Sequence, residues 1–210
     1  MNIQSTMGET QLFAAAPEDT RAAIMRATYE ALTSHGYANL TIQRIADEFE
    51  KSKSLLYHHY DGKDDLLVDF MQFMLEHFEN ETTCGDCSNP AERLDHLLER
   101  VVPDELDPEK HAFTSAMIEL RAQASHDPAY REQFTEHDTA LRDRFAAILR
   151  DGVADGTFAD VDPEQTADFL LALVNGIRTQ RVTRDDDGGV PGARAELDAY
   201  VDRHVRGGDD

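Results

Sequence analysis

Long hydrophobic runs are missing from this chain. None of its apolar stretches approaches the roughly 18 residues that a membrane-spanning helix needs. Residues 1–20 also lack the cationic segment and apolar centre of a secretory signal. We therefore expect a cytoplasmic protein that has no membrane partner.

Cysteine and tryptophan are scarce: the chain has two of the former and none of the latter. One pair of cysteines cannot staple a chain of 210 residues, so the fold must depend on a hydrophobic core. Hydrophobic residues make up 40% of the sequence, which is enough for such a core. Strand-like alternation of useful length and internal repeats are also missing, whereas apolar residues recur at helical spacing from Pro17 onward. The sequence predicts an all-α fold.

Recognisable catalytic groupings are missing as well. The chain contains no grouping of Ser, His and Asp that resembles a nucleophile triad, no phosphate-binding loop and no H-E-x-x-H metal motif. We therefore predict that the protein is not an enzyme and that it needs no cofactor.

Lysine is scarce, and its distribution is uneven. Three of the four lysines, Lys51, Lys53 and Lys63, lie within residues 40–67, and the fourth is Lys110. A chain with 42 acidic and 20 basic residues has little reason to gather its lysines in one segment unless that segment meets a negatively charged partner. Nucleic acid is the obvious candidate.

Acidic residues dominate the rest of the chain, whose net charge is -22. Residues 1–70 carry 6 basic and 11 acidic side chains, a balance of -5, which leaves -17 for residues 71–210. The chain has 4 lysines and 16 arginines, and 25 aspartates and 17 glutamates. This composition resembles that of proteins from halophilic archaea, whose carboxylate-rich surfaces stay soluble in concentrated salt. The alternative is an acidic protein of an ordinary cytoplasm, because net charge is a statement about solubility alone.

Residues 41–60 have the pattern of two short helices joined by a tight turn. Thr41 can cap the first helix, in which Ala46 is small enough for a close helix crossing. In the second helix, near residues 52–59, Leu56 and Tyr60 fall at i and i+4 and are expected to face the core. This geometry can place the second helix in the major groove of DNA. The side chains then left to reach DNA are Ser52, Lys53, Ser54, Tyr57 and His58.

The same segment resembles the helix-turn-helix head of the TetR (TetR/AcrR) family of transcriptional regulators. The shared pattern covers residues 18–70, and its elements stand here as Gly36-Tyr37, Thr41, Ile45-Ala46 and the run SKSLLYHHYDGKDDLL that begins at Ser52.

Three positions depart from the family pattern. Glu50 and Lys51 replace a glycine and an aliphatic residue in the turn, and Leu55 stands where a small or hydroxyl residue is common. These departures bear on the turn geometry and on the base preference.

Residues 1–16 have the sequence of a flexible tail. The resemblance implies a three-helix DNA-binding head at residues 17–70 and a helical ligand-binding and dimerisation body at residues 71–210. Thr41 and Lys63 are expected to contact phosphates from helix N-termini. The implied DNA-contacting residues are Thr41, Arg44, Ser52, Lys53, Ser54, Tyr57, His58 and Lys63. The alternative for this segment is a helical hairpin buried in a larger bundle, with Tyr57 and Tyr60 as core aromatic residues.

The body is expected to form further helices near residues 90–102, 108–126, 128–154, 162–182 and 193–206, which prolines punctuate. By the resemblance, they enclose a pocket for an unknown small-molecule effector, with plausible lining residues Phe113, Met117, Leu120, Tyr130, Phe134 and Leu141. The alternative is that this stripe of aromatic residues and methionine is ordinary core. Three nearby histidines, His111, His126 and His137, could reach such a pocket, but we expect them at the surface.

The family forms homodimers through its last two large helices. The helix near residues 162–182 carries the expected interface residues Phe169, Leu170, Leu173, Val174 and Ile177. The same stripe would also suit a helix buried within its own subunit. Two heads related by a two-fold axis would bind double-stranded DNA at a palindromic operator, with half-sites about one helical turn apart.

Cys84 and Cys87 form a C-x-x-C motif. This spacing can bind a soft metal or form a reversible disulfide, so a redox or metal sensor is the alternative function. A zinc site needs four ligands and the motif supplies two, so two exposed thiols are the simpler interpretation and we predict no metal.

A helical enzyme with an acquired DNA-binding head is a further alternative, which no catalytic residues support. Our main prediction is a ligand-responsive homodimeric transcriptional repressor.

Overall fold

The computed structural model describes residues 20–49, 53–81, 84–85, 87–184 and 190–207. Every regular element in these ranges is a helix, which confirms the all-α prediction. The tail predicted at residues 1–16 lies outside the described residues. The elements are α2 (Thr20–Asn39), α3 (Ile42–Glu48), α4 (Lys53–His59), α5 (Lys63–Glu81), α6 (Pro90–Val101), α7 (Pro108–Gln123), α8 (Pro128–Asp155), α9 (Pro163–Thr183), α10 (Val190–Tyr200) and the π-helical turn η1 (Val201–Val205).

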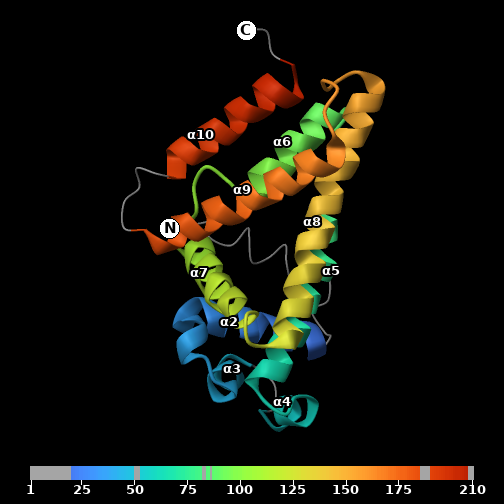
Figure 1. Cartoon of the computed structure of the whole chain (residues 1–210). Helices are drawn as coiled ribbons and strands as arrows, with labels where there is room; N and C mark the ends of the chain where they lie inside the picture. Colours follow the sequence, from blue (N-terminus) through green and yellow to red (C-terminus); the bar gives the residue numbers. More distant parts are fainter. Residues whose placement is uncertain (1–19, 50–52, 82–83, 86, 185–189, 208–210) are drawn as a thin grey trace, which may run out of the picture.

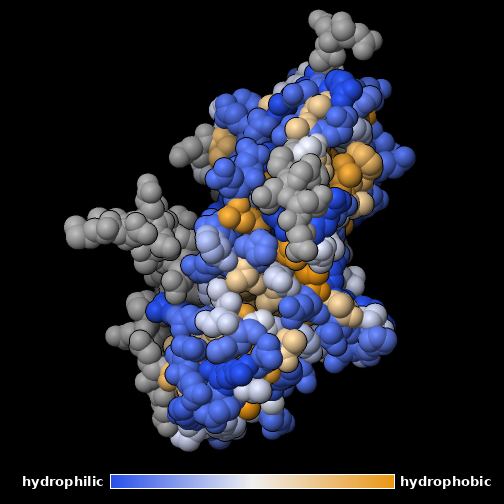
Figure 2. Space-filling model, turned by 90° about the vertical axis from the view of Figure 1, so that its left-hand side faces the viewer, coloured by the Kyte–Doolittle hydropathy of each residue, from blue (hydrophilic) through white to orange (hydrophobic). Residues whose placement is uncertain are grey.

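The helices form an elongated molecule with α3 and α4 at one end and α10 at the other (Figure 1). Helix α8 runs between the two ends, and both α5 and α9 pack against it. Helix α7 extends down to α2, with which it makes extensive contact. On the face drawn in Figure 2, hydrophobic residues gather in the middle and in the upper part of the molecule, and its lower end is mostly hydrophilic.

Four helices of the body begin with the same sequence pattern. An Asp or Asn residue caps the helix, and proline follows at the first helical position, where its missing N–H removes no helical hydrogen bond. The Asp162 side chain, for example, accepts hydrogen bonds from the backbone N–H groups of Glu164 and Gln165 at 3.0 and 3.1 Å. The four pairs are Asn89-Pro90, Asp107-Pro108, Asp127-Pro128 and Asp162-Pro163.

Two hydrophobic cores hold the described part of the chain together. The first joins α2, α3, α4 and α5 to residues of the body, including Leu120 on α7 and Tyr130 on α8. The second lies between α6, the distal half of α8, α9 and α10. The packing of the head is therefore continuous with α7 and with the start of α8.

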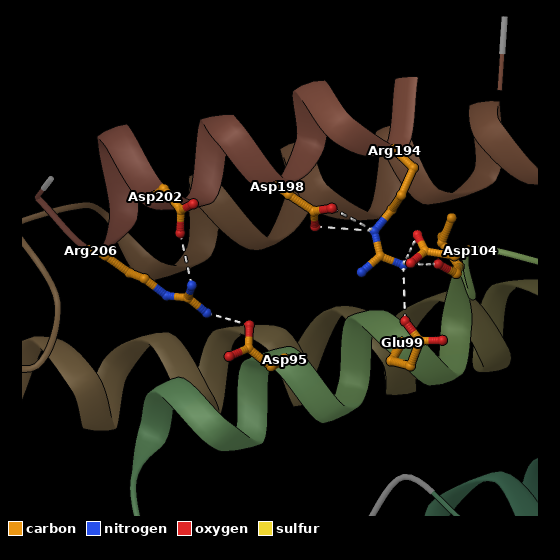
Figure 3. A network of polar contacts seen from close by, with 8 residues as sticks. Asp95, Glu99, Asp104, Arg194, Asp198, Asp202 and Arg206 are labelled. Atoms are coloured by element: carbon orange, nitrogen blue, oxygen red, sulfur yellow. Dashed lines mark hydrogen bonds and ion pairs between the residues drawn. The ribbon is translucent and has the colours of Figure 1, made fainter. Parts of the chain in front are cut away.

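Arg194 anchors α10 by donating hydrogen bonds inside the protein, where it is 9% exposed. Its Nε donates to both carboxylate oxygens of Asp198 at 3.1 Å. Its Nη1 donates to the carbonyl oxygen of Val102, just beyond α6, and lies 3.5 Å from Glu99 Oε2 (Figure 3).

Arg206 makes a second bridge between the same two helical regions. It pairs with Asp95 on α6 and, at 2.8 Å, with Asp202 on η1 (Figure 3). Arg206 and its partners are more exposed than Arg194, so we expect Arg194 to contribute more to stability.

Arg194→Met is expected to lower the free energy of unfolding by about 2 kcal/mol, because it leaves the Val102 carbonyl without its charged donor. Chemical denaturation in high potassium chloride, at one fixed protein concentration, measures the change. The matched control is Arg150→Met, which removes a 60% exposed arginine paired with Glu164 at 2.6 Å and should cost less than about 1 kcal/mol. Equal losses in the two variants would contradict the anchoring role.

Candidate nucleic-acid interface

The side chain of Thr41 fixes the start of α3. Its hydroxyl oxygen accepts a hydrogen bond from the backbone N–H of Arg44 at 3.2 Å, which satisfies one of the unpaired donors of the first turn. Ile45 and Ala46 are fully buried below, and so is Leu56 on α4. These contacts set α4 against α3 with its other side turned outward.

The outward side of α4 carries Lys53, Ser54, Tyr57 and His58, all exposed. Tyr57 is 47% exposed, so it is not the core aromatic residue of a buried hairpin. Its hydroxyl donates to Gln43 Oε1 on α3 at 3.1 Å.

Lys53 is tied to α3 as well. It forms an ion pair with Asp47, and the hydrogen bond from Lys53 lowers the pKa of that carboxyl. Both side chains are about half exposed. Ser52, the remaining residue expected on this helix, lies outside the described residues, as do Glu50 and Lys51 of the turn.

Tyr60 connects the end of α4 to the rest of the head. It is half-buried, and its hydroxyl donates to Asp69 on α5. Asp69 also accepts from Arg21 on α2 at 2.7 Å. Burial is the main cause that raises the pKa of Tyr60, so its hydroxyl stays a donor at neutral pH.

Lys63, the second expected phosphate contact, and Arg44, a further expected DNA-binding residue, both lie near helix N-termini. The Nζ of Lys63, at the first position of α5, lies 4.5 Å from the centre of the Tyr37 ring, a cation–π contact that orients the ammonium group. The guanidinium of Arg44 donates to the carbonyl oxygen of Asn39.

Polar contacts join this head to the body. The Tyr130 hydroxyl on α8 donates to Asp64 Oδ1 on α5 at 2.7 Å. The backbone N–H of Ala38, near the end of α2, donates to Glu119 Oε2 on α7 at 3.1 Å. Movement of α7 or α8 would therefore be transmitted to the helices that carry α3 and α4.

The body contains a cavity of about 450 Å³ between α5, α6, α7, α8 and α9. Of the residues expected to line a pocket, Phe113, Met117 and Phe134 do so. The others do not, because their helix faces point elsewhere. Leu120 and Tyr130 belong to the core that continues into the head, and Leu141 belongs to the distal core.

His137 corrects one sequence expectation. It lines the cavity instead of lying at the surface, whereas His111 and His126 are exposed as expected. Burial, followed by the nearby charge of Arg178, lowers the pKa of His137 to about 4. Its imidazole is therefore neutral at physiological pH.

The apolar stripe of α9 is divided between two environments. Leu170, Val174 and Ile177, which we expected at a dimer interface, are buried in the chain's own distal core. Phe169 is 43% exposed, and its ring lies 4.7 Å from that of Tyr200 on α10. Leu173 is half-buried beside it. The outer part of the stripe continues with exposed Ala172 and Gly176.

Cys84 and Cys87 form a disulfide between α5 and α6. They are therefore not the two exposed thiols that the sequence favoured. Within the described residues, no cluster of His, Cys, Asp or Glu side chains could hold a metal ion.

Comparison with known proteins identifies the family. Residues 24–70 match the DNA-binding model of bacterial regulatory proteins of the tetR family, and residues 90–206, more than half of the chain, match the C-terminal model of BetI-type transcriptional repressors. This chain belongs to the TetR family. It is a DNA-binding transcriptional regulator and not an enzyme.

Several relatives cover most of the TetR-family chain. A TetR transcription regulator from Haloarcula marismortui is 37% identical, with a TM-score of 0.79 over 88% of this chain and 97% of its own. The repressor AcnR of Corynebacterium glutamicum is 24% identical over 80% of this chain and 84% of its own. A regulator from Saccharomonospora viridis, solved in complex with choline, has the same fold at 21% identity, with a TM-score of 0.76 over 88% of this chain and 96% of its own.

None of the described helices is long and apolar enough to cross a bilayer.

Thr41→Ala is expected to lower the free energy of unfolding by about 1 kcal/mol, because α3 loses its cap. Thr41→Ser keeps a hydroxyl in the same place and should remain close to the parent protein. Thermal and chemical unfolding of the three proteins measure the difference. The capping role would be refuted by alanine and serine variants of equal stability.

Proposed function

We propose that this TetR-family regulator is a homodimeric repressor that binds a palindromic operator and releases it when a small molecule enters the body cavity. The observation that carries the proposal is the outward face of α4, where an exposed lysine, two hydroxyl side chains and an exposed histidine follow one another. Such side chains suit phosphates and base edges alike. Residues 17–70 would act as the DNA-binding head and residues 71–210 as the body.

The hydrogen bond and the ion pair between α3 and α4 support a DNA-binding surface that is already ordered in the free protein. Tyr57 is held by Gln43 and Lys53 by Asp47, so both side chains lie on the exposed surface before DNA arrives. Lys53 would exchange its carboxylate partner for a phosphate or a guanine. The expected contacts at the edges of this surface are Thr41, Arg44 and Lys63.

Effector control would act through the contacts between head and body. A ligand that favours one position of α7 also favours one position of α2, because Glu119 and Ala38 are bonded to each other. The bond from Tyr130 to Asp64 would act in the same way between α8 and α5. Release of the operator is then a population shift between two orientations of the heads.

Homodimerisation would use the outer face of α9 and α10. Phe169, Ala172, Leu173 and Gly176 recur on one side of α9 at helical spacing, and Tyr200 lies against Phe169. Small residues at Ala172 and Gly176 allow a second helix to approach closely. An apolar face of this kind favours an isologous contact with a second copy of the chain.

The working environment is part of the proposal. The acidic composition and the 37% identity to a Haloarcula marismortui protein support a regulator that acts in a salt-rich cytoplasm.

A redox sensor is the second candidate, and the disulfide between Cys84 and Cys87 favours it. Operator binding measured with and without a thiol reductant separates the two, since only the redox sensor should change its affinity.

Binding of the purified protein to its own upstream DNA in high potassium chloride tests the main proposal. The parent protein is expected to protect a palindrome, and the double variant Tyr57→Ala, Lys53→Ala should lose about a hundredfold in affinity, because each half-site loses contacts to base edges and phosphates. Arg150→Ala, which removes an exposed cation from α8, is the matched control and should bind normally. Unchanged binding by the folded double variant would rule out α4 as the reading helix.

Ala172→Arg is expected to convert the dimer to monomers, because it places a charge in the middle of the apolar face of α9. Light scattering coupled to gel filtration measures the mass. Ala147→Arg makes the same change at an exposed position of α8 and should leave the mass at that of the parent protein. A dimeric Ala172→Arg variant would refute this interface.

A further inference from the structure

The wall of the body cavity is cationic in a protein that is otherwise strongly acidic. The whole chain has 42 acidic and 20 basic residues. The charged residues of the cavity wall reverse this ratio, because Glu99 is the single acidic residue among the described residues that line it. The basic residues of the wall are Arg100, Lys110, Arg121, Arg178 and Arg181.

Arg121 and Lys110 are paired with carboxylates nearby. Arg121 donates two hydrogen bonds to the carboxylate of Asp138 at 2.7 and 2.8 Å and lies over the ring of Phe134. Lys110 lies 3.3 Å from Asp107. Their charges are therefore balanced within the protein.

Arg178 and Arg181 differ from them. They lie one turn apart on α9, so their side chains are neighbours on the same side of the helix. In the described part of the chain, no carboxylate lies within ion-pair distance of either guanidinium. Arg178 Nε donates to the carbonyl oxygen of Val101, at the end of α6, at 2.7 Å. This bond fixes the side chain. Asp138 acts on Arg178, and Asp104 and Glu99 act on Arg181, only from beyond ion-pair distance, and their charges partly oppose the fall in the pKa of each arginine.

The titration of neighbouring groups reflects the positive potential of this wall. Burial and the charge of Arg121 lower the pKa of Arg178 to about 10. The charges of Arg178 and Arg121 also contribute to the low pKa of His137. A buried cation without a counter-ion costs free energy that a bound anion would recover.

The rest of the wall is mostly apolar, and its neutral polar members are Thr114, Gln133, His137 and Asn175. Helices α5, α7 and α8 contribute the side chains of Met71, Met74, Phe113, Met117, Ile118 and Phe134. Methionine and aromatic side chains of this kind adapt to an apolar ligand body. The volume of about 450 Å³ lies in the range of small-molecule sites.

We infer that this cavity binds an amphipathic organic anion, a monocarboxylate whose charged group meets Arg178 and Arg181 while its apolar body contacts α5, α7 and α8. This inference rests on the proposed function, since it names the chemical class of the effector. The Saccharomonospora viridis regulator was solved with choline, which is a cation. Quaternary ammonium ions are held by aromatic faces, and a wall with two unpaired arginines disfavours them.

Titration calorimetry on the full-length protein tests the inference with octanoate, octylammonium and choline as probes. The first two share a chain length and differ in the sign of their charge. Octanoate should bind at least about tenfold more tightly than either cation, and Arg178→Gln or Arg181→Gln should each weaken octanoate binding by about tenfold or more. Arg178→Lys should restore part of the affinity, and the exposed-site control Arg150→Gln should leave it unchanged.

Three results would overturn the inference: equal or tighter binding of either cation, unchanged octanoate affinity in both glutamine variants, or no saturable octanoate binding at all. If Arg178→Gln fails to fold, Arg181→Gln carries the test, because it leaves the hydrogen bond from Arg178 to Val101 in place. Release of operator DNA by octanoate is measured separately. Arginine-dependent octanoate binding without release would refute the proposed induction while leaving the inference in place.

Discussion

The contact between α7 and α2 is the constraint on which the rest of the structure depends. Phe113 on α7 packs against Tyr29 of α2, with ring centres 4.7 Å apart, and against Phe70 of α5 at 6.3 Å. The same Phe113 side chain lines the body cavity. One aromatic residue therefore belongs both to the packing that positions the head and to the wall of the cavity. A rigid, close-packed core transmits small displacements instead of absorbing them.

The head could be predicted from the sequence because local chemistry decides it. A capping threonine, the buried pair Ile45-Ala46 and the i, i+4 spacing of Leu56 and Tyr60 each specify one feature of a small helical unit. The body could be predicted only as a set of helices. Its four Asx-Pro pairs fix where helices begin, but they do not fix which neighbour covers which face.

Tertiary packing explains what the sequence could not provide. Leu120 and Phe113 occupy the same helix, yet only Phe113 reaches the cavity, while Leu120 is fully buried in the core shared with the head. Leu170 and Phe169 are adjacent in the chain, and only the partner helices decide that one is buried. The arginines of α9 gave no signal in the sequence, since an arginine on an amphipathic helix is normally solvated.

The distribution of charge separates the protein into two electrostatic environments. The outer surface is rich in carboxylates and meets the solvent directly, and at molar salt the screening length falls to about 3 Å. Arg178 and Arg181 belong to the cavity wall, and burial lowers the pKa of both. Binding of DNA at the exposed face of α4 should weaken as salt rises, whereas an ion pair formed with the proposed anion in the partly desolvated cavity would be screened less. The affinity for the effector would then change little when the salt concentration inside the cell changes.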